Sequence, residues 1–168
     1  MSRRSWYLIL GLALALHNGE EAVRAARMLQ FMQSDAPGFL REVYAGTTVS
    51  ELQGSLVILT AIALFGVVVA AGFSAAAASA FGMMVLAALL GLNAIFHIAL
   101  SIQAGAYMPG LVTALLISLP VSITLLVRAR HQRWVSARAF WAVLPVAILI
   151  HGPVLSAVFT LSLGLMRE

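Results

Sequence analysis

Seven polar side chains in this sequence could together form a site for metal binding or proton transfer, and all of them interrupt otherwise apolar stretches. His17, Glu20, Glu21 and Arg24 follow one another at i, i+3, i+4 and i+7, which places them on one face of a helix. Asn93 and His97 are also one helical turn apart, and His151 stands alone further along the chain. Polar groups inside a bilayer usually face the protein interior, so the spacing predicts a buried polar site.

The composition shows what kind of chain must position these residues. Among 168 residues, 62% are hydrophobic and only 10% are charged, whereas a soluble domain has roughly 25% charged residues. Mean hydropathy is +1.00. We therefore exclude a soluble enzyme, a disordered tail and a nucleic-acid binder. All ten basic residues are arginine, and cysteine is absent, so the chain has no disulfide, thiolate metal site or thiol nucleophile.

Apolar stretches of about 20 residues are long enough to cross a bilayer as helices. Four stretches meet this length easily, and a fifth at the N-terminus does so if its polar half is included. We expect an all-α, polytopic membrane protein with five transmembrane helices in one bundle and a single domain over residues 1–168. The expected helices are 5–32, 53–73, 78–104, 108–128 and 138–166.

Arginine placement predicts the orientation of this bundle. Arg3 and Arg4 precede the first helix, and four more arginines lie between the fourth and fifth helices. With five spans both groups fall on one side, which the positive-inside rule makes cytoplasmic, together with the N-terminus. We expect the bacterial inner (plasma) membrane. The start of the chain also fits a cleaved signal peptide, but the exported product would itself consist of four apolar spans.

Depth supports the grouping of the polar residues. With ~1.5 Å rise per residue, His17 lies about 18 Å above the inner end of its helix and Glu20 and Glu21 about 22–24 Å. The same arithmetic gives about 22 Å for Asn93, about 20 Å for His151 and about 28 Å for His97. Three helices therefore bring their polar side chains to a similar level, which predicts one shared site.

Two chemistries fit that site. In the first, His17, His97 and His151 bind zinc or non-haem iron together with Glu20 or Glu21. Our leading assignment takes Glu20 as the carboxylate ligand, with Glu21 as general base, Arg24 as partner of an anionic group and Asn93 as an orienting donor. In the second, no metal is present, and the two carboxylates and a histidine form an acid–base site that isomerises a lipid.

These assignments lead to four functional hypotheses. The first is a membrane-embedded, metal-dependent hydrolase or lipid-modifying enzyme that acts on a lipid-like or isoprenoid substrate. The second is the metal-free isomerase. The third is a small proton-coupled transporter, since buried Glu and His chains also relay protons. The fourth is a structural subunit whose polar residues hold helices together. Expected partners are membrane lipids and a hydrophobic small molecule, with a homo-oligomer left open and nucleic acid excluded.

The motif His17-Asn18-Gly19-Glu20-Glu21 resembles that of the HXXEE-motif integral membrane proteins, a family without an assigned function. The later Asn93, His97 and His151 resemble the remaining polar positions of that family. A weaker likeness is to CAAX-protease-type intramembrane metalloenzymes, which pair a Glu-Glu-xxx-Arg motif with later histidines. Here Glu20-Glu21 is followed by Arg24 one residue too soon. A third likeness, of architecture alone, is to five-helix sterol isomerases.

Overall fold

The computed structural model describes residues 1–154, 156–158 and 161. Within these residues the chain is helical and has no strand, which confirms the all-α expectation. The helices are α1 (Arg3–Val23), α2 (Ala25–Ser34), α3 (Gly38–Tyr44), α4 (Val49–Gly72), α5 (Ala77–Ala104), α6 (Leu111–Thr113), α7 (Leu119–His131) and α8 (Ala137–Leu149). Two π-helical segments, η1 (Ala114–Ser118) and η2 (Ile150–Val154), continue α6 and α8.

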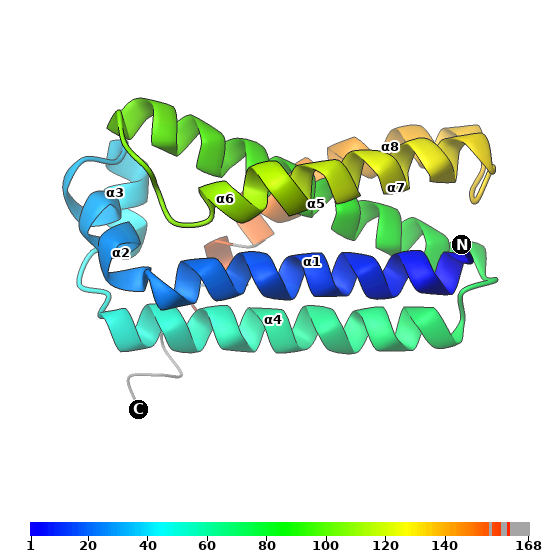
Figure 1. Cartoon of the computed structure of the whole chain (residues 1–168), viewed down its shortest axis with the longest axis horizontal. Coiled ribbons are helices and arrows are strands. Elements are labelled where there is room, and N and C mark those ends of the chain that lie inside the picture. The colour runs from blue at the N-terminus through cyan, green and yellow to red at the C-terminus, as the bar shows by residue number, and fades with distance from the viewer. Residues whose placement is uncertain (155, 159–160, 162–168) are drawn as a thin grey trace.

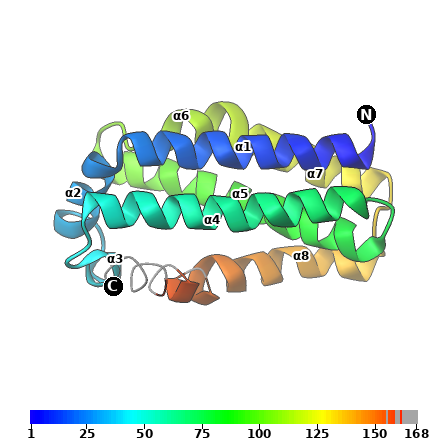
Figure 2. The same cartoon turned by 90° about the horizontal axis from the view of Figure 1, so that it is seen from below.

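The long helices lie side by side along one axis (Figures 1 and 2), and the chain reverses direction from each to the next. Helix α5 is the central helix, since it contacts α1, α4, α7 and α8. The main core surrounds it and includes Leu10 of α1, Met84 and Leu90 of α5 and Leu125 of α7. Each of these side chains is almost completely buried, so the bundle has a closely packed centre.

Within the described residues, four helical stretches are long and apolar enough to cross a membrane, not the five that we expected. They are Val49–Gly72, Ala77–Ala104, Leu111–His131 and Ala137–Val158. Helix α1 lies alongside α4 (Figure 1). Its second half, however, carries His17, Asn18, Glu20 and Glu21, and these side chains lower its apolarity below that of a spanning segment. The polar residues that contribute to the site are therefore also the reason why α1 does not qualify as a fifth span.

Apolar side chains also cover the outside of the bundle. Large hydrophobic residues are exposed along the long helices, among them Ile62 and Phe65 of α4, Ile95 of α5 and Leu144 of α8. A water-soluble monomer rarely exposes such a surface. The exposed residues are therefore compatible with a membrane protein whose helices face lipid.

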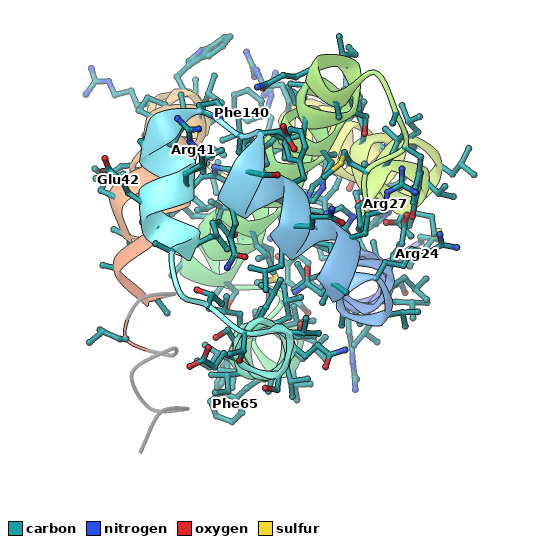
Figure 3. The ribbon with its side chains drawn as sticks, turned by 90° about the vertical axis from the view of Figure 1, so that its left-hand side faces the viewer. Arg24, Arg27, Arg41, Glu42, Phe65 and Phe140 are labelled. Atoms are coloured by element: carbon teal, nitrogen blue, oxygen red, sulfur yellow. The ribbon has the colours of Figure 1, made fainter. Side chains whose placement is uncertain are left out.

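The expected first helix, 5–32, is divided at Arg24, where the backbone leaves helical geometry at φ −116° and ψ 24°. After this break α2 turns across the end of the bundle (Figure 3). Its Met28 and Met32 pack against Leu100 and Met108. A straight continuation of α1 would leave the methionines without these partners. Tertiary packing therefore explains a break at which the sequence, over residues 20–28, has neither Pro nor Gly.

Arg3, at the start of α1, and Arg128, in the last turn of α7, lie at the same end of the bundle. Arg3 Nη1 donates to the carbonyl of Ala75 over 3.3 Å, and Arg128 Nη2 donates to the carbonyl of Met1 over 3.3 Å. This is the arrangement that the charge pattern requires, and its cytoplasmic orientation stays a prediction. The last part of the expected helix 138–166 lies outside the described residues.

Candidate functional site

His17 and Glu21 of α1 and His97 of α5 come together inside the bundle. Their potential ligand atoms all lie within 4.8 Å of one another. Glu21 Oε1 is 3.1 Å from His17 Nε2 and 3.0 Å from His97 Nε2. The three residues are 0%, 4% and 1% exposed, respectively. One turn of α1 therefore supplies an imidazole and a carboxylate, and α5 supplies the second imidazole.

Glu21 Oε1 lies beside both imidazoles, and it shares with His97 Nδ1 the lack of a hydrogen-bond partner among the described residues. Although both imidazole nitrogens are within hydrogen-bonding distance, neither contact has hydrogen-bond geometry, and Oε1 has no hydrogen-bond partner among the described residues. A buried polar atom without a partner costs about 1–3 kcal/mol, and more if it is charged. The atom therefore needs a proton or a cation between itself and the two nitrogens.

Thr113, which ends α6, determines which nitrogen of His17 carries hydrogen. Its Oγ1 lies 2.6 Å from Glu20 Oε2 and 2.8 Å from His17 Nδ1. An ionised carboxylate only accepts, so the single hydroxyl proton is donated to Glu20, and Oγ1 accepts from His17 Nδ1–H. In the neutral imidazole this leaves a lone pair on Nε2, which accepts from the amide N–H of Asn93 over 2.8 Å and also lies 3.1 Å from Glu21 Oε1. The tautomer is assigned from the hydrogen-bond network.

Glu20 lies outside the buried group. Its oxygens accept hydrogen bonds from the Tyr107 hydroxyl at 2.6 Å, from the Thr113 hydroxyl, and from the backbone N–H groups of Val112 and Thr113 at 3.3 and 2.8 Å. These backbone groups belong to the first turn of α6, where an acidic side chain is stabilising. The structure thus places Glu21, rather than the expected ligand Glu20, beside the histidines, and Glu20 contacts the helix start next to His17.

The loop between α5 and α6 fixes His97 from the other side. Gly110 has φ +89°, and a Cβ on this residue would lie 2.7 Å from His97 Nδ1. Glycine therefore allows both the left-handed backbone and the close approach of the imidazole. The expected helix 108–128 begins in this loop, and the expected site did not include Tyr107, Gly110 or Thr113. The only local signal was the Pro109-Gly110 pair.

Asn93 and His151 are next to the group rather than in it. Asn93 Nδ2 lies 2.8 Å from His17 Nε2, and Asn93 Oδ1 lies 3.4 Å from His151 Nε2. The Asn93 amide therefore donates to the Nε2 lone pair of His17, in agreement with the tautomer set by Thr113. His151 therefore does not belong to the three-residue group. It lies in the π-helical segment η2, and such segments are frequent at functional sites.

Arg24 is exposed and points away from the histidines. Its guanidinium carbon lies 5.2 Å from the centroid of the Tyr107 ring, and that of Arg27 lies 5.4 Å from the same centroid. Figure 3 shows both arginines at one edge of the bundle end. Arg24 therefore lies over Tyr107 and forms no ion pair with the buried carboxylate of Glu21.

The segment α2–α3 closes the bundle over the site. Figure 3 shows both helices lying across the end from which it is viewed. Two apolar clusters hold this cap: Met28, Met32, Leu100 and Met108 form one, and Ala25, Leu29, Leu52 and Leu56 form the other. Tyr44 packs against both clusters. The cap excludes water from the group and strengthens the electrostatic interactions inside it.

Two imidazoles and one carboxylate are a donor set that proteins use for catalytic zinc and for non-haem iron, with further coordination positions left open. A hydrogen-bonded carboxylate behind a ligating histidine is also common in such sites. Here Glu20 occupies that position, with the Thr113 hydroxyl between it and His17. The residues present are therefore chemically suited to hold one such ion.

Comparison with known proteins gives a family but no function. No curated protein and no solved structure shows a significant match to the chain, and nothing in the comparisons supports the likeness to CAAX-protease-type enzymes. Residues 8–125 match the family described as "Protein of unknown function with HXXEE motif". This range includes the buried group, Asn93 and Thr113, whereas His151 lies beyond it. The protein belongs to the HXXEE-motif family, and its motif contributes His17 and Glu21 to the buried group and Glu20 to the contacts behind it.

Proposed function

We propose that this protein is a membrane-embedded, metal-dependent enzyme that acts on a lipid-like substrate, with His17, Glu21 and His97 as ligands of zinc or non-haem iron. One observation carries the proposal. A buried carboxylate oxygen lies about equally close to two imidazole nitrogens without a hydrogen bond to either. A cation that accepts one lone pair from each residue satisfies all three atoms at once.

The surrounding residues fit the roles of such a centre. Glu20 and Thr113 hold the tautomer of His17 that presents the Nε2 lone pair. A bound divalent ion supplies Lewis-acid chemistry, which polarises a carbonyl or phosphoryl oxygen of an ester. His151 is linked to the site through Asn93, and we assign it the transfer of a proton to or from the substrate.

A lipid-like substrate follows from the surroundings of the site. The group lies inside a bundle whose outer surface is largely apolar, so molecules dissolved in the bilayer meet this surface at the highest concentration. His17, Glu21 and His97 would supply three ligands, and a site of this kind would leave room for the substrate at the ion, as in catalytic rather than structural sites.

Metal analysis of the purified full-length protein tests this proposal. We expect about one zinc or iron ion per chain, and a stoichiometric loss of the ion in His17→Ala and His97→Ala. His131, which is exposed at the end of α7, supplies the matched control: His131→Ala should retain the ion. A wild-type preparation that neither contains nor binds zinc or iron would rule out the metal-dependent function.

A second candidate is a proton-coupled carrier, and a different observation favours it. Hydrogen bonds connect His17 through Thr113 and Glu20 to Tyr107, which is only half-buried. Such a chain is suited to conduct protons between the buried imidazole of His17, next to Glu21, and the surface. Proton flux into proteoliposomes that requires Glu21 and proceeds without metal would favour the carrier over the enzyme.

A further inference from the structure

We infer that Arg24 and Arg27, stacked on Tyr107, form a binding site for the phosphate headgroup of a membrane lipid. Two guanidinium groups share one aromatic ring, at 5.2 and 5.4 Å from its centroid. A guanidinium over an aromatic ring is attracted to its electron-rich face, which restricts the side chain to few conformations. The pair is therefore oriented before any anion arrives.

The charges of this pair are not neutralised by the protein. Within the part of the chain that the structure describes, neither guanidinium makes an ion pair or a side-chain hydrogen bond. The nearby carboxylate of Glu20 accepts instead from Tyr107, Thr113 and the α6 backbone. By contrast, Arg3 and Arg128 donate to backbone carbonyls. Two cations held together in this way repel each other unless an anion lies between them.

Phosphate is the anion that suits both the donors and their place. A guanidinium offers parallel N–H groups that match two phosphate oxygens, and two such groups favour a doubly charged phosphate over a carboxylate. The pair lies where α1 ends, at the same end of the bundle as the start of α4 and the end of α5 (Figures 1 and 3). If these apolar helices span the bilayer, this is the level of the lipid headgroups.

The same tyrosine connects the arginines to the buried group. Its ring contacts both guanidinium groups, and its hydroxyl donates to Glu20, which in turn accepts from Thr113 beside His17. A headgroup held by the arginines would therefore lie next to the residues that orient the proposed metal ligand. That the bound lipid is also the substrate rests on the proposed function, whereas the binding of phosphate does not.

The test measures binding of three probes to the full-length protein in detergent micelles by isothermal titration calorimetry. The probes are dioctanoyl phosphatidate, dioctanoylglycerol and inorganic phosphate. We expect phosphatidate to bind and dioctanoylglycerol to bind much more weakly. The double substitution Arg24→Gln/Arg27→Gln should weaken phosphatidate binding about tenfold or more, since charge-assisted hydrogen bonds are lost. Inorganic phosphate that binds as tightly as phosphatidate would overturn the lipid assignment.

Arg41→Gln is the matched control. Arg41 is exposed on α3 at the same end of the bundle, but its Nη1 already donates to the carbonyl of Ser34. An equal loss of phosphatidate binding in Arg41→Gln and in the double variant would show unspecific attraction to surface charge and overturn the site. Arg24→Lys/Arg27→Lys keeps the charge but not the planar group, and should bind with intermediate affinity.

Two further readouts keep the outcomes separate. Thermal unfolding of the double variant should match that of wild type, because both side chains are exposed. A loss of phosphatidate binding with an unchanged melting curve is then due to the arginines themselves and not to unfolding. Metal content is measured in the same preparations. A metal-free protein that still binds phosphatidate through the arginines would refute the proposed enzyme and leave the phosphate site intact. A protein that contains the metal but does not bind phosphatidate through the arginines would refute the phosphate site alone.

Discussion

Gly110 lies so close to His97 that a Cβ on the glycine would come within 2.7 Å of Nδ1 and 2.8 Å of Cε1. The imidazole therefore has no room to move towards the loop between α5 and α6. This contact determines where Nε2 of the same ring lies, and Nε2 is the atom that faces Glu21 over 3.0 Å. A residue without a side chain thus positions a member of the buried group.

Gly110→Ala should displace His97 and abolish metal binding. Its matched control is Gly105→Ala, because Gly105 also has a positive φ, of +59°, but has no atom within 4 Å of a Cβ. Both variants should lose roughly 1–2 kcal/mol of unfolding free energy from backbone strain. Only Gly110→Ala should lose the ion, as measured by elemental analysis after chromatography. Equal metal content in the two variants would contradict the positioning role.

The two glutamates of the motif should respond differently to loss of charge. Glu21→Gln removes a proposed ligand, so we expect no detectable metal at micromolar concentrations of free zinc. Glu20→Gln leaves the ligand set intact and weakens the contacts behind His17, so zinc affinity should fall about 10–100-fold. Competition with a chelating dye measures both affinities. A larger loss in Glu20→Gln than in Glu21→Gln would restore the assignment expected from the sequence.

Thr113 should be replaceable by serine but not by valine. Serine keeps the hydroxyl that links Glu20 Oε2 to His17 Nδ1, whereas valine preserves the shape and removes that link. We expect Thr113→Val to lower zinc affinity about 10–100-fold and Thr113→Ser to change it little. Nitrogen-15 NMR of labelled histidine reports the tautomer directly. If His17 keeps hydrogen on Nδ1 in Thr113→Val, the hydroxyl does not set the tautomer.

Tyr107 should ionise only in strong alkali. Partial burial, followed by its hydrogen bond to Glu20 and the charge of that carboxylate, raises the pKa of Tyr107 to about 12. The proton is therefore held more tightly in the folded protein, so its contribution to stability is present below pH 10 and lost as the pH rises towards 12. In Glu20→Gln the pKa should fall towards its ordinary value.

The measurement is the tyrosinate absorbance near 295 nm between pH 9 and 12. The chain has three tyrosines and no cysteine or lysine, so few other groups titrate in this range. Subtracting the same titration of Tyr107→Phe isolates this side chain. An unchanged difference curve in Glu20→Gln would show that the carboxylate has no influence on Tyr107.

The sequence predicted which helices meet at the site better than it predicted which atoms meet there. The common level of His17, Asn93 and His97 follows from helical rise, and the structure does bring these residues together. The choice between Glu20 and Glu21 depends on the rotation of α1 about its axis. That rotation is set by packing against other helices, above all α4, which no periodicity within residues 1–32 contains.

The remaining residues of the site were hidden for other reasons. Thr113 is separated from His17 by 96 positions, and a lone threonine near the start of an apolar helix has no distinguishing pattern. The break at Arg24 arises from packing of α2 against distant residues of α5 and the loop that follows it. The ideal helical rise brings His151 to the level of Asn93, and its Nε2 does lie 3.4 Å from Asn93 Oδ1, but it stands in a π-helical segment outside the three-residue group.

The cap formed by α2 and α3 has a kinetic consequence. Since the buried group is almost inaccessible and the cap is held by two apolar clusters, an ion could enter or leave only when this segment opens. Exchange would then follow the rate of local unfolding rather than that of diffusion. Loading would be fastest while the chain is still being inserted and its end is uncovered, so the metal available at the time of synthesis would decide which ion the mature protein carries.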